Sequence, residues 1–229
     1  MRRTTPGVEL ASAWVSRAEA HDPERVVRVL EPMVTDARRA RLLDVIGRRL
    51  SSVAVVFDAP YDPHNGAAVV RSCEAFGVQR LHVLERKGTP FAVASAVARG
   101  AEKWIDVVRH AHAPTLLAWA REEDLPLVGA HPEGELVPTD LAALPRVAIV
   151  LGNEREGIRD VLAQACSARV RVPMRGFAES LNVSVTGAIL LDAATHGRPG
   201  DLDASDRRRL YARGLYLSVS HAEDVLGAQ

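Results

Sequence analysis

The stretch SVAVVFDAPYDPHNGAAVVRSCEAFGVQRLHVLE, residues 52–85, decides the fold class. Within it, Val53–Asp58 is a short apolar run with the length of a buried strand. His64–Phe76 has the residue spacing of a helix, and Gly77 is a common residue at a helix end. Arg80–Glu85 is predicted to form a second strand. A strand, a helix and a second strand in succession predict a parallel pair with a crossover helix.

The alternation of strands and helices continues along the chain to residue 196. Such alternation predicts an α/β fold in which helices cover both faces of a parallel sheet. Further strands are predicted at Trp104–Val108, Leu125–Ala130, Val147–Leu151 and Arg169–Val172, and further helices near Pro114–Glu123, Gly157–Ala165 and Leu181–His196.

The two ends of the chain have a different pattern. From Val8 to Leu50, apolar residues recur every three or four positions, which predicts helices separated at Pro23 and Pro32. After a linker rich in Pro, Gly and Asp, the segment Ser205–Leu226 is also predicted to be helical. This pattern divides the chain into a helical N-terminal extension (1–51), a central domain (52–197) and a helical C-terminal extension (198–229).

The charge of the chain is balanced overall but unevenly placed. Its 29 Lys and Arg residues equal its 29 Asp and Glu residues, which taken alone argues against a polyanionic partner. All the basic residues except Lys87 and Lys103 are arginines. The codon usage of a GC-rich genome would explain this excess, and so would a surface for phosphate, which guanidinium groups bind through two hydrogen bonds.

Arginine clusters flank the central domain and are the candidates for such a surface. They lie in DARRARLLDVIGRRL, residues 36–50, and in the triplet at residues 207–209. A solvated helix face would produce the same pattern, so both interpretations stay open. The flanking residues proposed to bind RNA phosphates are Arg38, Arg39, Arg41, Arg48, Arg49, Arg207 and Arg208.

Several other classes of protein are excluded by missing patterns. No apolar run approaches the ~20 residues of a membrane span, and no apolar stretch of a secretory signal follows residues 1–7, so a cytoplasmic location is expected. Cys73 and Cys166 are too far apart for a disulfide framework or a zinc site, and His110 is expected at the surface, so no metal is expected. The loop at residues 152–157 lacks the glycine and lysine patterns of dinucleotide and nucleoside triphosphate sites.

Polar residues gather instead at three places that follow predicted strands. In the first, Asn65 is expected to cap the helix, and Arg71 lies among small apolar residues of that helix. A buried charge is costly without an anionic partner, so Arg71 has either a functional role or a salt bridge. The second place is the glycine-bounded loop at residues 152–157. In the third, polar residues at every second position of 180–184 predict a turn.

These three places resemble the three motifs of the SPOUT superfamily, in particular the TrmH branch of RNA 2′-O-ribose methyltransferases. The matching segments are PHNGAAVVRSCEAFGV (63–78), IVLGNEREGI (149–158) and VPMRGFAESLNVSVTGAILL (172–191), and GAEKW (100–104) matches as well. The resemblance covers about residues 36–196. It implies a sheet with a deep C-terminal trefoil knot, a homodimer, S-adenosylmethionine as cofactor and RNA as substrate.

The resemblance also assigns roles to residues of this sequence. It implies a catalytic set of Arg71, Asn65, Glu154, Ser180 and Asn182, with Arg71 also contacting RNA. Ala130 stands where threonine is common in TrmH-like sequences, which leaves adenine binding to the backbone. The implied cofactor residues are Ala130, Leu151, Gly152, Asn153, Glu154, Gly157, Val172, Pro173, Met174, Leu181 and Asn182.

Arg71 matches the arginine that is often described as the general base of the family. Because the pKa of arginine exceeds about 12, a neutral guanidine is scarce at pH 7. We therefore favour a role in which Arg71 binds a neighbouring phosphate and stabilises the alkoxide.

The expected substrate is guanosine 18 in the D-loop of tRNA. Relatives that act on rRNA usually carry a separate α/β domain before the core, whereas this chain has a short helical segment there. Two alternatives stay open: an rRNA 2′-O-ribose methyltransferase, and an RNA-binding protein without catalytic activity. A small-molecule methyltransferase is disfavoured because it leaves the arginine-rich flanks without a role.

Overall fold

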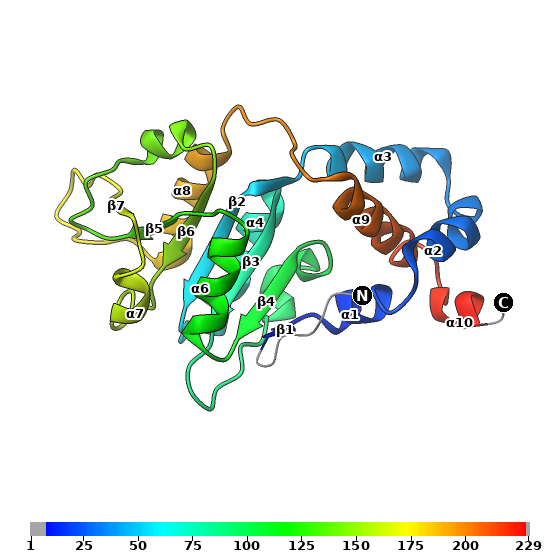
Figure 1. Ribbon diagram of the computed structural model, residues 1–229, viewed down its shortest axis with the longest axis horizontal. Coiled ribbons are helices and arrows are strands. Elements are labelled where there is room, and N and C mark those ends of the chain that lie inside the picture. Colours follow the sequence, from blue (N-terminus) through cyan, green and yellow to red (C-terminus); the bar gives the residue numbers. More distant parts are fainter. Residues whose placement is uncertain (1–7, 228–229) are drawn as a thin grey trace.

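A seven-stranded sheet forms the centre of the structure, a computed structural model that describes residues 8–227 (Figure 1). The strand order is β1-β4-β3-β2-β6-β5-β7, and every pair is parallel except β1 with β4. The predicted α/β class and the mainly parallel sheet are thus confirmed. The strands are β1 (Val8–Leu10), β2 (Leu50–Asp58), β3 (Val78–Leu84), β4 (Asp106–His110), β5 (Leu127–Ala130), β6 (Val147–Leu151) and β7 (Ala168–Val170).

Strand β2 is apolar along its length because it is buried on both faces. Val53, Val55 and Phe57 belong to the core beneath α4 (Pro63–Ala75) and α8 (Val183–Thr195). Its alternate residues belong to a second core with α6 (Ala113–Glu122) and α7 (Asp160–Ala163). Figure 1 shows α6 in front of the sheet and α4 and α8 behind it. The continuous apolar pattern thus reflects a central parallel strand.

The helices from the two ends of the chain pack together in one core. Apolar residues of α2 and α3 contact those of α9 and α10, so segments far apart in sequence lie side by side (Figure 1). The sequence predicted these helices but not their contact. The division at residues 51 and 197 stays a prediction. The helices are α1 (Ala13–Ala18), α2 (Pro23–Leu30), α3 (Asp36–Gly47), α9 (Ala204–Tyr216) and α10 (Ala222–Gly227), and α5 (Ser95–Ala98) lies beside α4.

Three details of the sequence prediction are wrong. Val8–Leu10 was expected to be helical but forms β1, antiparallel to β4. The C-terminal helix is divided into α9 and α10, and His221 before α10 has a positive φ of 55°. His110 is buried rather than exposed, with its Nε2 2.8 Å from Nδ1 of His82, and burial lowers the pKa of His110 to about 4.

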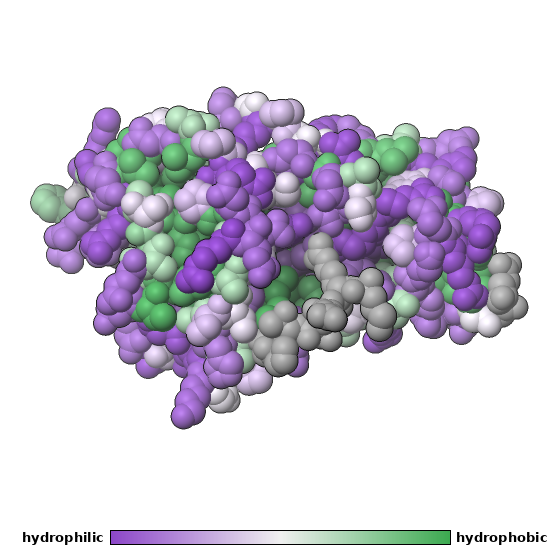
Figure 2. Space-filling model, in the orientation of Figure 1, coloured by the Kyte–Doolittle hydropathy of each residue, from purple (hydrophilic) through white to green (hydrophobic). Residues whose placement is uncertain are grey.

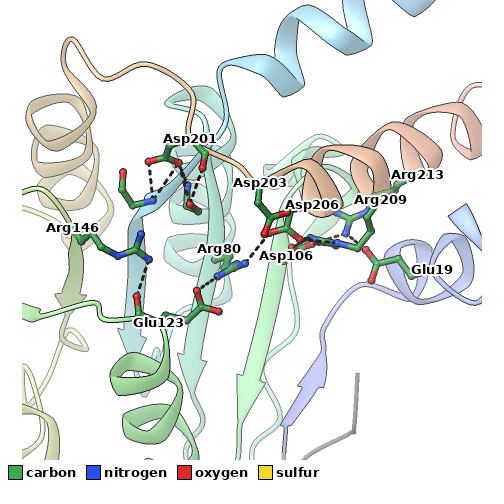
Figure 3. Close-up of polar contacts among 12 residues, drawn as sticks. Glu19, Arg80, Asp106, Glu123, Arg146, Asp201, Asp203, Asp206, Arg209 and Arg213 are labelled. Atoms are coloured by element: carbon green, nitrogen blue, oxygen red, sulfur yellow. Dashed lines mark hydrogen bonds and ion pairs between the residues drawn. The ribbon is translucent and has the colours of Figure 1, made fainter. Parts of the chain in front are cut away.

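Buried ion pairs join the helical core to the sheet (Figure 3). The carboxylate of Asp106 on β4 lies 2.5 Å from Nη2 of Arg213 and 2.8 Å from Nη2 of Arg209, both on α9. Glu19, at the end of α1, pairs with the same two arginines. Burial alone would raise the pKa of Asp106, but the two guanidinium groups outweigh it and hold that pKa well below its usual range. The cluster therefore fixes α9 against the sheet by charge as well as by packing.

Two sequence expectations concern the membrane and export. No helix within residues 8–227 has both the length and the apolar character needed to cross a bilayer. The expectation about a secretory signal falls partly on residues 1–7, which lie outside the described part of the chain.

Replacing Asp106 should destabilise the fold strongly. Asp106→Asn removes the buried carboxylate that both arginines share and leaves the buried Arg213 paired with Glu19 alone, so the free energy of unfolding should fall by about 3–5 kcal/mol. The control Asp36→Asn removes an exposed surface partner and should change it by less than about 1 kcal/mol. Urea titrations followed by circular dichroism measure both effects, and equal stability of the two variants would contradict the prediction.

The same carboxylate predicts a pH dependence. The pKa of Asp106 is lower in the folded state than in the unfolded state, where it is about 4. The ionised Asp106 therefore stabilises the fold fully at pH values above that unfolded pKa, and this stabilisation is lost as the pH falls below it. Asp106→Asn should show a smaller loss between pH 5 and pH 3 than the wild-type protein (about one pH unit on either side of the carboxyl pKa). The same urea titrations at the two pH values test this expectation.

Candidate active site

The three polar places predicted from the sequence meet at the carboxyl edge of the sheet. Glu154, after β6, accepts a 2.6 Å hydrogen bond from Nδ2 of Asn65 in α4. Asn182, at the start of α8, donates through Nδ2 to Oδ1 of Asn65 at 3.0 Å. Asn65 thus links residues 89 and 117 positions away from it. These three side chains are called the amide–carboxylate set below.

The role expected for Asn65 as a helix cap is wrong. Asp62 is the N-cap of α4 and accepts a hydrogen bond from the backbone N–H of His64 at 2.8 Å, with Pro63 in the first helical position. Asn65 lies three residues after the N-cap, in the first turn, where its side chain reaches Glu154. The helix thereby positions Asn65 without using it as a cap.

Asn182 is itself the N-cap of α8. Its Oδ1 accepts hydrogen bonds from the backbone N–H of Ser184 at 2.8 Å and from the Ser184 hydroxyl at 2.7 Å. Because Oδ1 is occupied in this way, Nδ2 is directed to Asn65. The alternating polar residues were expected to form a turn, but they mark the irregular segment before α8, its N-cap and its first turn.

The loop at residues 152–157 is closed tightly by its own backbone. Asn153 and Gly157 exchange two backbone hydrogen bonds of 3.0 and 3.1 Å, and Gly157 has a φ of +71°. A Cβ atom on Gly152 would lie 2.3 Å from the carbonyl carbon of Gly157. Both glycines are therefore required by geometry, and the turn holds Glu154 at its tip.

A buried aspartate that the sequence analysis did not single out holds the far side of this loop. Asp58, at the end of β2, is fully buried and accepts a 2.7 Å hydrogen bond from the backbone N–H of Arg159. The Arg159 side chain donates to the same carboxylate at 2.8 and 2.6 Å. The sequence does contain a signal for this role, because Asp58 is the one charged residue at the end of the apolar strand Val53–Asp58.

A cavity of about 470 Å³ lies beside the amide–carboxylate set. That volume is in the range typical of small-ligand sites. Of the residues implied to bind a cofactor, all except Pro173 line it, and Ser180 does so as well. His131 and Glu179 are polar lining residues that the sequence analysis missed, although His131 directly follows a predicted strand. The lining residues from that prediction are Ala130, Leu151, Gly152, Asn153, Glu154, Gly157, Val172, Met174, Leu181 and Asn182.

Arg71 is exposed on α4 and makes no hydrogen bond or ion pair with any residue in the described range 8–227. The desolvation cost that made it conspicuous in the sequence is therefore absent, and so is the salt bridge considered as an alternative. Its guanidinium group is free to bind an external anion.

The arginines expected to bind RNA from the flanking helices are mostly engaged within the protein. Arg49 was wrongly placed on the surface: it is 3% exposed, donates to Glu74 at 3.0 Å, and burial lowers its pKa. Arg38 donates to the hydroxyl of Ser218 at 2.9 Å. Acidic neighbours pair with Arg39, Arg41, Arg48 and Arg208, whereas the side chain of Arg207 is exposed and makes no hydrogen bond or ion pair within residues 8–227.

The mainly parallel sheet, the cavity at its carboxyl edge and the joined motif segments agree with the family match below, which shows an RNA methyltransferase of the SPOUT class. The chain belongs to the SpoU rRNA Methylase family, whose model matches residues 52–192.

Two relatives with assigned names differ in how much of their length is matched. The chain is 29% identical over 200 residues to a tRNA (guanosine(18)-2'-O)-methyltransferase of Aquifex aeolicus, covering 86% of this chain and 89% of the relative. It is 32% identical over 162 residues to the 23S rRNA (guanosine-2'-O-)-methyltransferase RlmB of Coxiella burnetii, covering 69% and 64%. The chain thus spans less than two thirds of the rRNA-directed relative.

Solved structures give the same fold. The TrmH/SpoU tRNA modifying enzyme of A. aeolicus superposes with a TM-score of 0.71 at 24% identity, over 81% of this chain and 98% of that one, which supports the fold alone. The SpoU methyltransferase AviRb of Streptomyces viridochromogenes, in complex with the cofactor AdoMet, superposes with a TM-score of 0.57 at 25% identity, over 67% and 63%.

The tight backbone geometry of the loop at residues 152–157 should be essential for binding of the cofactor. In Gly152→Ala the added methyl group meets the Gly157 backbone, so the loop must shift and the affinity for S-adenosylmethionine should fall at least about tenfold. Gly47→Ala is the control, because its Cβ meets nothing within 4 Å. Calorimetric titration with S-adenosylmethionine measures both, and wild-type affinity in Gly152→Ala would contradict the expectation.

Proposed function

We propose that the protein methylates a ribose 2′-hydroxyl in RNA, with guanosine 18 of tRNA as the substrate. The observation that carries this proposal is the amide–carboxylate set, which joins the three family motifs beside a cavity and includes Asn65 of the helix that carries the unpaired Arg71. Membership of the SpoU family supports the reaction class. The expected place of action is the cytoplasm.

The cavity fits S-adenosylmethionine, the cofactor of this reaction. Leu151, Val172 and Leu181 supply apolar walls, and the loop after Gly152 brings backbone polar groups next to them. When bound, the cofactor supplies a methyl group made electrophilic by its sulfonium. The protein then has to place the ribose hydroxyl in line with that methyl group and steady the developing charge.

Arg71 holds the RNA for this step. Its free guanidinium group binds the phosphate next to the target ribose and stabilises the developing alkoxide, while that phosphate or water accepts the proton. Asn65 orients the ribose and is itself held by Glu154 and Asn182. Ser180 lies at the cavity and supports the bound cofactor or RNA.

We propose a homodimer in which apolar residues near the cavity meet a second copy. Phe177 is fully exposed, and Val185 on α8 is 46% exposed although both are large and apolar. Such residues typically mark interfaces when they gather beside a functional site. Leu181 and Met174 are exposed in the same region, which extends the surface to the cavity wall.

The proposed trefoil knot concerns the same part of the chain. Backbone hydrogen bonds join Leu136 to Arg169 and Arg171, so the segment after β5 lies along β7. A Cβ on Gly134 would lie 2.6 Å from the Val170 backbone, which marks a very close crossing. This crossing supports passage of the chain after β7 through that loop.

The extent of the match favours tRNA over rRNA. The relative named for guanosine 18 of tRNA is matched over 89% of its length, whereas the rRNA-directed relative is matched over 64%. An rRNA target is the second candidate, since the rRNA-directed relative is slightly more similar where it is matched. A silent RNA-binding role fits less well because the catalytic set is complete.

Labelled S-adenosylmethionine and separate pools of tRNA and rRNA test these alternatives. Label in tRNA, located to guanosine 18 by mass spectrometry of nuclease fragments, is the expected result. Label in rRNA alone would overturn the proposed tRNA substrate but support the proposed reaction. Binding of RNA without transfer of label would overturn the catalytic proposal.

The guanidinium fork of Arg71 should matter beyond its charge. Arg71→Lys keeps the positive charge but loses the two-pronged contact, so kcat should fall about 100-fold or more, in the range for loss of a transition-state donor. The affinity for S-adenosylmethionine should stay unchanged, because Arg71 does not line the cavity. Single-turnover methyl transfer measures the change. A wild-type rate in the lysine variant would rule out a catalytic role for the two-pronged guanidinium contact.

A further inference from the structure

Two guanidinium groups share one aromatic ring at the carboxyl edge of the sheet. The Cζ atom of Arg86 lies 4.0 Å from the ring centroid of Tyr61, and that of Arg155 lies 4.5 Å from it. Both distances are within the ~6 Å range of cation–π contacts. Tyr61, Arg86 and Arg155 follow β2, β3 and β6 respectively, so they lie at the edge that holds the cavity.

Neither guanidinium group is neutralised by the protein. Within residues 8–227, the side chains of Arg86 and Arg155 make no ion pair and no hydrogen bond. The Nε atom of Arg86 is buried and has no hydrogen-bond partner there. Two like charges held on one ring repel each other, which an approaching anion relieves. Their free N–H groups suit the oxygens of a phosphodiester.

The ring is tied directly to the amide–carboxylate set. The backbone N–H of Tyr61 donates to Oε2 of Glu154 at 3.3 Å, while Oε1 of the same carboxylate accepts from Asn65. Arg155 follows Glu154 in the chain, and its backbone N–H donates to Oδ1 of Asn153 at 3.0 Å. An anion on these arginines is therefore next to the site of methyl transfer.

The loop that carries Arg86 is fixed on both sides of it. Its carbonyl accepts a hydrogen bond from the backbone N–H of Thr89 at 3.1 Å, and Phe91 donates its backbone N–H to Glu85 at 2.7 Å. Phe91 is buried against α4, where a Cβ on Gly66 would lie 2.5 Å from its ring. Arg86 is thus held in place before any ligand arrives, which lowers the entropy cost of binding.

We propose that Arg86 and Arg155, held on Tyr61, form a phosphodiester clamp for the RNA strand adjoining the target nucleotide. This inference rests on the function proposed above and adds a subsite to it. The clamp would bind the backbone and not a base, so it would set the path of the strand without reading its sequence.

Alanine variants test the clamp through RNA binding. Arg86→Ala and Arg155→Ala should each raise the Kd for unfractionated tRNA about 3- to 10-fold and make the slope of log affinity against log salt shallower by about 1. Tyr61→Leu should weaken binding similarly, whereas Tyr61→Phe keeps the ring and should bind as the wild type does. The control is Arg121→Ala, an exposed arginine in the last turn of α6, which should also bind like the wild type.

Binding of S-adenosylmethionine separates the clamp from a structural role. The clamp leaves the Kd for S-adenosylmethionine unchanged in all variants, so a parallel loss of cofactor affinity would overturn the proposal. Wild-type tRNA affinity and salt slope in the Arg86→Ala/Arg155→Ala double variant would overturn it too, as would a wild-type protein that binds no tRNA. Methyl transfer by the wild-type protein, assayed separately, decides the proposed function independently.

Discussion

The hydrogen bond between Asn65 and Glu154 is the contact on which the candidate site depends. It joins the first helix after the central strand to the loop after β6, and through Asn182 it reaches the start of α8. The first turn of α4, the loop after β6 and the start of α8 are thus joined by one partly buried polar set. Because the buried Asn65 makes both hydrogen bonds, moving its side chain would break the connection to both other segments at once.

The sequence predicted the elements of the central domain well because their signals are local. A buried parallel strand such as Val147–Leu151 is apolar at every position, and its observed first and last residues are those predicted from the sequence. The three motif segments also came together as expected. The misassigned cap shows the limit: Asp62, Pro63 and Asn65 all suit a helix start, and only the position of Glu154 reveals the use of Asn65. The burial of Arg49 likewise depends on Glu74, a partner that its own segment does not indicate.

Electrical neutrality has a structural explanation. Arginines of the flanking helices are largely paired with carboxylates, either at the surface, as Arg48 with Asp44, or in the interior, as Arg213 with Asp106. Arg71, Arg86 and Arg155 have no such partners within residues 8–227, and Arg86 and Arg155 lie at the edge of the sheet that holds the cavity. Figure 2 shows hydrophilic surface over much of the visible face, with apolar patches between. The loops after β3 and β6 therefore place free positive charge at the edge that holds the cavity, whereas the basic helices retain little of it, as in Arg207.

The joint core of the terminal helices has a consequence for how the protein is made. Tyr211 on α9 donates its hydroxyl to Glu31 across 180 positions of sequence, and α2 and α3 bury their apolar faces on the same helix. These early helices therefore cannot complete their packing until α9, 180 positions further along the chain, has left the ribosome. Closing so long a loop is slow, and until it closes the nascent N-terminal segment exposes apolar surface that chaperones recognise. Synthesis and folding of this helical part are thus separated in time, while the sheet can form before it.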